Sequence, residues 1–404
     1  MNLPRFIQIH TLHNYPGALL NRDDAGLAKR LPYGDKIRTR ISSQCLKRHW
    51  RMADDHFSLS NLGFELEKRS TDFLDRIRLK LETEGVTPSH ALATVEALAE
   101  GLKLNRNAKK KDKFRTSEIL LLGVNEVSYL TSFCLEFSKQ YPDAKLLAAA
   151  IKEHIDEKPK DGRKSFKDNL KALLELSGLT SALFGRMVTS DVFASRDAAV
   201  YVAHAFTVHE AQVENDYFTV VDDLVSESEE QGSAGIFDTE LASGLYYGYV
   251  VVDVPQLIAN LEGGENTKDW ATLPAEKREL AGRVVQHLLH LIATVSPGAK
   301  RGSTAPFEWA KFLLVEVGDW QPRSLAGAFQ NALPLNQPAI REAAVQMLSD
   351  EIGKLDDAYG APLDRRFLAL DKVAVPNAQR LSLNDLATWV QAYITQGSAP
   401  AQAA

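Results

Sequence analysis

NRDDAGLAKRLPYGDKIRTRISSQCLKRHWR, residues 21–51, carries nine basic side chains against three acidic ones. The whole chain has the opposite balance, with a formal net charge of −6 over 404 residues. A strongly basic segment inside an acidic protein is typical of a surface that binds a polyanion. We therefore predict that this stretch contacts a polyanion.

The order of residues in this stretch predicts a strand followed by a helix. Basic side chains alternate with others over KIRTRI, 36–41, which is the period of an edge or hairpin strand. Ser42 and Ser43 then stand at the position of a helix N-cap, and an amphipathic helix is expected from Gln44 to about residue 54. Its apolar stripe consists of Leu46, Trp50 and Ala53.

The start of this helix has the features of a phosphate-binding site. The first N–H groups of a helix have no partner within it, and hydroxyl, amide and basic side chains lie close by here. Each basic residue alone is better explained as part of a solvated helix face, whereas the whole combination of side chains favours phosphate binding. The side chains concerned are Ser42, Ser43, Gln44, Lys47, Arg48 and Arg51.

Composition places the chain among ordinary globular proteins, with 45% apolar and 25% charged residues. Its length suits one large domain with insertions, or two domains. Two cysteines cannot form a disulfide framework, which fits a reducing cytoplasm. No segment has the composition of a membrane span, and residues 1–10 lack the apolar core of a signal peptide. We therefore expect a cytoplasmic protein.

The pattern along the chain predicts a mixed α+β fold built from distant strands. Strands are expected at 5–12, 243–253 and 312–317. Residues 54–177 are predominantly helical in pattern, and 280–295 is an apolar-striped helix.

Smaller features follow from local composition. ALFGRMVTS, 182–190, is predicted to be strand-like, and the region beyond Trp320 to be mainly helical. His10 and His13 are three residues apart on a strand and the loop after it, and this spacing does not suit a metal pair. We therefore expect them to be polar residues on an exposed sheet face. Small residues from 397 onward are typical of a disordered tail.

Candidate catalytic groups are sparse. The adjacent carboxylates Asp23–Asp24 and Asp222–Asp223 would suit Mg²⁺ and phosphodiester cleavage, but nothing fixes a third ligand or a base. PGAKRGST, 297–304, does not have the residue order of an ATP-binding phosphate loop. We expect a protein without catalysis, metal or cofactor.

Other side chains extend the nucleic-acid prediction. Tyr217 and Phe218, on a predicted hairpin arm, and Met187 would stack on the bases of single-stranded RNA. Core packing is the alternative for the two aromatic residues, and spacing alone favours it. Lys300 and Arg301 lie in a glycine-containing loop. A basic run contains possible contacts to duplex DNA, at Lys109, Lys110, Lys111 and Lys113.

Six motifs occur in a characteristic order: LNRDD (20–24), RISSQCLKR (40–48), FGRMVTS (184–190), YFTVVDDL (217–224), QGSA (231–234) and PGAK (297–300). The chain resembles the CasC backbone subunits of type I-E CRISPR Cascade surveillance complexes, members of the RAMP superfamily. The resemblance covers most of the chain to about residue 320. It departs at Cys45, where a small polar residue is expected, and at the long acidic segment 225–230.

The resemblance implies an RRM-like (ferredoxin-like) palm with a large helical fingers insertion and a β-hairpin thumb. The implied parts are the palm at 1–54, 182–210 and 243–390, the fingers at 55–181, the thumb at 211–242 and a disordered tail at 391–404. Several copies of such a subunit line up along one guide RNA (crRNA) in the bacterial cytoplasm and present it for pairing with target DNA in antiviral defence.

The resemblance also implies roles for particular residues. Met187 would wedge against guide bases, while Tyr217 and Phe218 would lie near a displaced nucleotide. Guide phosphates would be held by Arg22, Lys29, Ser42, Gln44, Lys47 and Arg51, and Arg40 is a further RNA-binding candidate. The implied partners are the guide RNA, the target DNA strand, further copies of the chain, other Cascade subunits and a recruited helicase-nuclease that degrades the DNA.

Two other functions were weighed against this one. An RNA-processing or metal-dependent endonuclease of the same superfamily would lose cleavage when Asp23 or Asp223 is replaced by Asn. A monomeric RNA-binding protein of general metabolism would bind one short RNA and show no preference for CRISPR transcripts.

Overall fold

The computed structural model describes residues 4–64, 66–106, 114–157, 163–187, 193, 195–219, 236–263, 270–360 and 363–396. The chain divides into two compact units. The first unit is Met1–Leu59, Val200–Val254 and Ala281–Ala404, and the second unit is Ser60–Ala199 and Pro255–Leu280.

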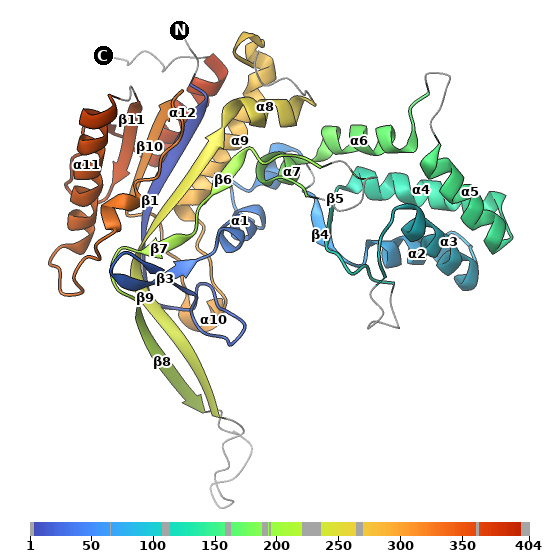
Figure 1. Ribbon diagram of the computed structural model, residues 1–404, viewed down its shortest axis with the longest axis horizontal. Coiled ribbons are helices and arrows are strands. Elements are labelled where there is room, and N and C mark those ends of the chain that lie inside the picture. The colour runs from blue at the N-terminus through green and yellow to red at the C-terminus, as the bar shows by residue number, and fades with distance from the viewer. Residues whose placement is uncertain are drawn as a thin grey trace, which may run out of the picture. The chain divides into compact units, whose positions relative to one another are not determined.

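A ten-stranded sheet organises the first unit (Figure 1). Its centre is β1 (Phe6–Ala18), which pairs antiparallel with β9 (Ile236–Asp253) on one side and β10 (Phe312–Gly318) on the other. The outer strands are β2 (Arg30–Tyr33), β3 (Lys36–Ile41), β6 (Val200–Val202), β7 (Ala205–Thr207), β8 (Gln212–Thr219), β11 (Asp364–Ala369) and β12 (Ala378–Arg380). The β11–β12 pairing is parallel. The three predicted strands at 5–12, 243–253 and 312–317 are thus confirmed as the middle of this sheet.

Helices cover both faces of this sheet. On one face, Leu12 of β1 packs with Leu348 of α11 (Ile340–Tyr359) and with Phe329 of η3 (Ala326–Phe329). On the other face, Tyr15 packs with Leu46 of α1 (Ser43–Arg51). The remaining helices of the first unit are α9 (Ala275–Thr294), of which residues from 281 belong here, α10 (Arg301–Thr304) and α12 (Leu383–Gln396).

The burial of β1 corrects the expectation that His10 lies on an exposed face. His10 is fully buried, because η3 and α11 from the C-terminal part of the chain cover that face of the sheet. The His10 Nε2–H donates to Glu316 Oε2 at 3.1 Å, since a carboxylate only accepts. Nδ1 therefore accepts from the Tyr247 hydroxyl at 2.9 Å. Loss of hydration lowers the pKa of His10, so the ring is neutral.

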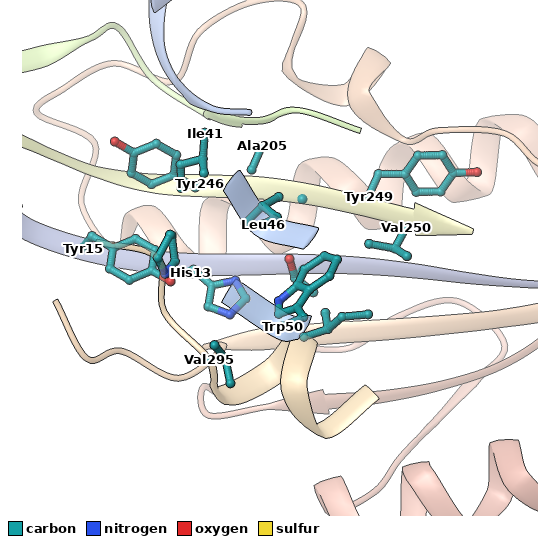
Figure 2. A pocket seen from close by; sticks show the side chains of 14 residues that line it. His13, Tyr15, Ile41, Leu46, Trp50, Ala205, Tyr246, Tyr249, Val250 and Val295 are labelled. Carbon is teal, nitrogen blue, oxygen red and sulfur yellow. The ribbon is translucent and has the colours of Figure 1, made fainter. Parts of the chain in front are cut away.

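His13 on the opposite face is half-buried rather than exposed. It lines a small pocket of about 30 Å³ beneath α1, together with Tyr15, Leu46, Trp50 and Val295 (Figure 2). Burial lowers the pKa of His13 to about 4. The apolar stripe predicted for α1 is therefore the face by which this helix is held against the sheet.

The second unit is predominantly helical, as predicted. Its core includes Leu74, Leu98, Leu130 and Ile151, each from a different helix. Its elements are η1 (Leu59–Leu62), which begins at the last residue of the first unit, β4 (Lys68–Ser70), α2 (Phe73–Thr83), α3 (Pro88–Gly101), β5 (Leu120–Leu122), α4 (Val124–Gln140), α5 (Ala144–Asp156), α6 (Phe166–Ser177), α7 (Leu179–Phe184), α8 (Val254–Glu262) and η2 (Trp270–Thr272).

Three sequence-based assignments differ from the structure. The predicted strand at 182–190 is wrong, because 182–184 complete α7, and Gly185 then ends the helix with a φ of 77°. The region beyond Trp320, predicted to be helical, also supplies β11 and β12 to the sheet. Residues 391–396 of the predicted tail belong to α12, and 397–404 lie outside the described residues.

Within the described part of the chain, no helix has an apolar stretch of the length needed to cross a membrane.

The first unit is expected to lose stability in mild acid through His290. This side chain is 3% exposed and stacks on Phe57 with ring centroids 3.5 Å apart. Burial lowers the pKa of His290 from 6.5 to about 4. The unfolded histidine therefore binds a proton below pH 6.5 while the folded one does not, so this residue's share of stability is lost as the pH falls from 6.5 towards 4. The loss at pH 5 is about 2 kcal/mol.

Urea unfolding of the full chain at pH 7 and pH 5 measures this loss. His290→Phe keeps an aromatic ring against Phe57 but cannot titrate, so its pH-dependent fall should be smaller by about 2 kcal/mol. An equal fall in both proteins would assign the acid sensitivity to other groups.

Candidate nucleic-acid interface

The N-terminus of α1 forms as the sequence predicted. Ser42 is the N-cap, and its hydroxyl accepts from the Cys45 N–H at 3.3 Å. The Ser42 N–H donates to the Asn21 side chain at 2.9 Å, which ties the helix start to the preceding loop. Ser42 is buried, whereas Gln44 in the first turn is exposed and Ser43 is partly exposed. Ser43 and Gln44 therefore lie nearer to solvent than the capping hydroxyl does.

Two of the alternating basic residues of β3, Arg38 and Arg40, have different surroundings. Arg38 is fully buried, and its guanidinium donates to the carbonyl oxygens of Thr207 and Phe329, each at 3.0 Å. Arg40 is only partly buried, and it donates to the Arg30 carbonyl oxygen at 3.2 Å. Arg38 thus joins the sheet to the η3 segment, and Arg40 is the residue of this pair that is available to a ligand.

Arg40 lies beside His204 and Lys29. Its Nη1 is 3.2 Å from His204 Nδ1. Loss of hydration lowers the pKa of His204, and the charges of Arg40 and Lys29 lower it further. The Arg40 N–H also donates to the Lys29 carbonyl oxygen at 2.7 Å, so these three residues are neighbours.

The same positive charge continues over α1 to α10. Burial raises the pKa of the Cys45 thiol to about 11, and the charges of Lys29 and Arg48 oppose the rise. Burial also lowers the pKa of His49, and the charges of Arg301 and Arg48 add to that decrease. Lys29 and Arg40 are joined by a backbone hydrogen bond, and Arg48 and Arg301 line one groove. These four cations of the first unit are called the basic surface below.

The other basic residues that were predicted to bind RNA lie around the basic surface. Arg22 is exposed and forms a backbone bridge with Ala28. Lys47 and Arg51 are partly buried on α1. Lys300 donates to the hydroxyl of Thr239 on β9, and the preceding Ala299 N–H bonds to the Leu19 carbonyl oxygen at 2.8 Å.

Glu240 of β9 positions the 21–30 loop, a role that sequence reasoning missed. Its buried carboxylate accepts from the Ala28 N–H at 2.8 Å and pairs with the Arg30 guanidinium. The Lys29 backbone lies between these two anchors and bonds to Asn21 and Arg40. No local pattern marks Glu240, because its partners Ala28 and Arg30 lie 212 and 210 residues away in sequence.

The β8–β9 hairpin carries the predicted aromatic residue on an exposed ribbon. β8 pairs with the first half of β9, and Figure 1 shows the two strands extending beyond the rest of the sheet. Tyr217 is 63% exposed, which contradicts the alternative of core packing for this residue. The Phe218 backbone pairs with Phe237, while its side chain lies outside the described residues.

Met187 belongs to the second unit and is 97% exposed. The adjacent Arg186 is buried, with Nη1 2.9 Å from each carboxylate oxygen of Glu126. The predicted DNA-contacting residues Lys109, Lys110, Lys111 and Lys113 lie outside the described residues.

Of the two candidate carboxylate pairs, only Asp23–Asp24 lies among the described residues. Asp23 Oδ1 accepts from the N–H groups of Ala25 and Leu27 at 3.0 and 2.9 Å, which closes a turn. Asp222 and Asp223 lie outside the described residues. Among the residues that are described, no three His, Cys, Asp or Glu side chains gather in a way that could hold a metal ion.

The fold and the interface define a mixed α+β protein with a positive region on its sheet unit. The chain belongs to the family of CT1975-like proteins, whose model matches residues 7–392. It is similar to a chain of a "CRISPR RNA-guided surveillance complex, pre-nicking", with 25% identity, a TM-score of 0.75 and coverage of 96% of this chain and 99% of that one. A chain of a second "CRISPR RNA-guided surveillance complex" has the same fold, with 23% identity, a TM-score of 0.64 and coverage of 95% and 99%.

No curated protein matches this chain. The family match and the first structural likeness confirm the resemblance to Cascade proteins and the mixed α+β fold that the sequence predicted.

Proposed function

We propose that this chain is a non-catalytic backbone subunit of a Cascade-type CRISPR surveillance complex, of type I-E, present in several copies along one guide RNA. The observation that carries the proposal is the basic surface of the first unit. It joins Arg40 and Arg48 of the motif RISSQCLKR to Lys29, which follows LNRDD, and to Arg301, which follows PGAK. The full-length likeness to a chain of an RNA-guided complex supports the same function.

The proposed mechanism is a grip on the guide's backbone. Lys29, Arg40 and Arg48 would neutralise phosphates, and the first N–H groups of α1 would donate to phosphate oxygens. Base edges then stay available for pairing with target DNA, so target specificity comes from the guide and not from the protein. Cleavage of the DNA would fall to a separate helicase-nuclease.

The sheet of the first unit would be the RRM-like palm, the second unit the fingers, and the β8–β9 hairpin the thumb. Tyr217 on the hairpin would lie near the displaced nucleotide of the guide, and Met187 would wedge against its bases. Ser42 would act mainly by capping α1, with Ser43 and Gln44 as the more exposed donors.

Co-expression with a CRISPR repeat-spacer transcript and the other complex subunits tests this function. The purified particle is weighed by native mass spectrometry, and the RNA inside it is sized. One intact guide with several copies of this chain is the expected result. RNA cut at regular steps would support the endonuclease alternative instead, and a monomer without RNA would exclude both.

Replacing basic side chains of α1 with alanine is expected to weaken RNA binding equally for all RNA sequences. The double variant Lys47→Ala/Arg51→Ala loses two phosphate contacts, so the slope of log affinity against log salt should flatten by about two. Fluorescence anisotropy with two unrelated RNA sequences at several salt concentrations measures this slope. Lys354→Ala on α11 is the matched control, since it removes an exposed base outside the basic surface. An unchanged slope in the double variant would remove α1 from the interface.

A further inference from the structure

A groove of about 580 Å³ lies in the first unit at the C-terminal end of α1. Its walls come from α1 with the residues after it, from the segment that follows α9, and from α10 with the loop after that helix. The lining residues that matter here are Arg48, His49, Met52, Asp55, Arg301 and Phe307.

Two large apolar side chains of this groove are turned to solvent. Met52 is 64% exposed and Phe307 is 67% exposed. Single exposed apolar residues are ordinary on protein surfaces, whereas these two line one groove together with Arg48 and Arg301.

The charges around Phe307 indicate the kind of partner. The Arg301 guanidinium lies 6.0 Å from the centre of the Phe307 ring, and its charge acts on His49 together with that of Arg48. The groove is therefore continuous with the basic surface. A flat ring beside a guanidinium group, in a groove that a second arginine also lines, suits a nucleotide, whose base stacks on the ring while its phosphates meet the guanidinium groups.

Asp55 sets the direction in which a nucleotide would lie. Its carboxylate accepts from the Phe57 N–H at 2.9 Å and lies on the wall formed by the residues after α1, whereas Arg301 belongs to the wall formed by α10. A phosphate would be repelled from this end of the groove and attracted to the end with Arg301, whereas a carboxylate tolerates the amino groups of a base.

We propose that this groove binds an unstacked nucleobase of the guide RNA, with Phe307 as the stacking surface and Arg48 and Arg301 on the flanking phosphates. The inference rests on the proposed function and adds to it a base-contacting site in the first unit separate from Tyr217 and Met187. An acidic peptide of a partner protein would find the same cations, but it would leave the aromatic ring without a flat counterpart.

The test compares Phe307→Ala with Phe307→Trp and with Trp309→Ala in the full chain. Trp309 is 70% exposed and is not among the groove's lining residues, so it is a matched aromatic control. Phe307→Ala should lower single-stranded RNA affinity roughly ten-fold while the salt slope stays unchanged, because stacking and not a phosphate contact is lost. Phe307→Trp should bind as the parent chain does, and Trp309→Ala should differ by less than about two-fold.

Photocrosslinking with 4-thiouridine-substituted RNA locates the contact directly. Crosslinks should map to the loop after α10 and disappear in Phe307→Ala. Parent-like affinity of Phe307→Ala, or crosslinks confined to other segments, would overturn the groove as a base site, while the salt-slope result for Lys47 and Arg51 would keep the proposed function. Loss of another subunit from the particle, with RNA affinity intact, would make the groove a protein contact and overturn the proposal. RNA binding absent from the parent chain would overturn both.

Discussion

Replacing Glu316 with Gln is expected to lower the free energy of unfolding by about 3–5 kcal/mol. The Glu316 carboxylate is fully buried in the sheet and accepts from His10, from Arg323 at 2.6 and 2.9 Å, and from Arg365 Nε at 2.7 Å. Burial works to raise the pKa of Glu316, but the hydrogen bonds from His10 and Arg323 outweigh it and hold the pKa well below its usual range. The carboxylate is therefore charged, and it compensates guanidinium charge inside the protein.

The neutral amide of Gln would leave that positive charge uncompensated. Arg365 would keep Asp356 as a partner, but Arg323 would lose both of its bonds to a carboxylate. Thermal unfolding should shift by about 10 °C for a unit of this size. Glu214→Gln is the matched control, because it makes the same change on the exposed β8 strand and should cost less than about 0.5 kcal/mol. Equal midpoints for the two variants would contradict the role given to Glu316.

The sequence predicted the β3–α1 segment well because its signals are local. Alternation over 36–41 follows from the strand period, and the Ser42 cap satisfies N–H groups within its own helix turn. Leu46 and Trp50 of the predicted apolar stripe lie within the nine residues of α1, whereas the helix ends at Arg51, before Ala53 and earlier than predicted. Each of these features depends on neighbours only a few positions away.

Burial by distant segments could not be predicted in the same way. His10 and Arg38 both alternate with apolar residues, which is the pattern of a strand with one wet face. Both are fully buried, because the C-terminal part of the chain covers that face and supplies Glu316 and the Phe329 carbonyl oxygen as partners. A single sequence does not state which distant segment returns to a given face.

In the candidate site, too, features with a local sequence signal were predicted and features that depend on distant segments were not. Motifs and charge identified Lys29, Arg40 and Arg48, which the fold brings together in the basic surface. Glu240 was missed, because a buried carboxylate that anchors a loop has no pattern of its own. Tyr217 had core packing as its favoured alternative, and only the isolated position of the hairpin shows that it is exposed.

Replacing Glu126 with Gln is expected to destabilise the second unit by about 3–5 kcal/mol. Burial raises the pKa of Glu126, but the facing Arg186 works in the opposite direction and favours the charged carboxylate. The pair is almost completely buried, and Arg186 also donates to the Leu121 carbonyl oxygen at 3.1 Å. Without the carboxylate the guanidinium remains buried as an uncompensated charge, which costs more than the pair itself contributes.

The double variant Glu126→Gln/Arg186→Leu distinguishes this cause from a simple loss of packing. It removes both charges, so it should recover more than half of the stability that Glu126→Gln loses. Urea unfolding of the full chain measures all three proteins, with Glu153→Gln on the exposed side of α5 as the control. A double variant no more stable than the single one would contradict a charge effect.

Arg186 precedes the exposed Met187 and bonds through its backbone to Arg196 in both directions at 2.9 Å. The buried pair therefore also fixes the point from which Met187 extends, and a folded double variant should hold Met187 less rigidly than the parent chain does.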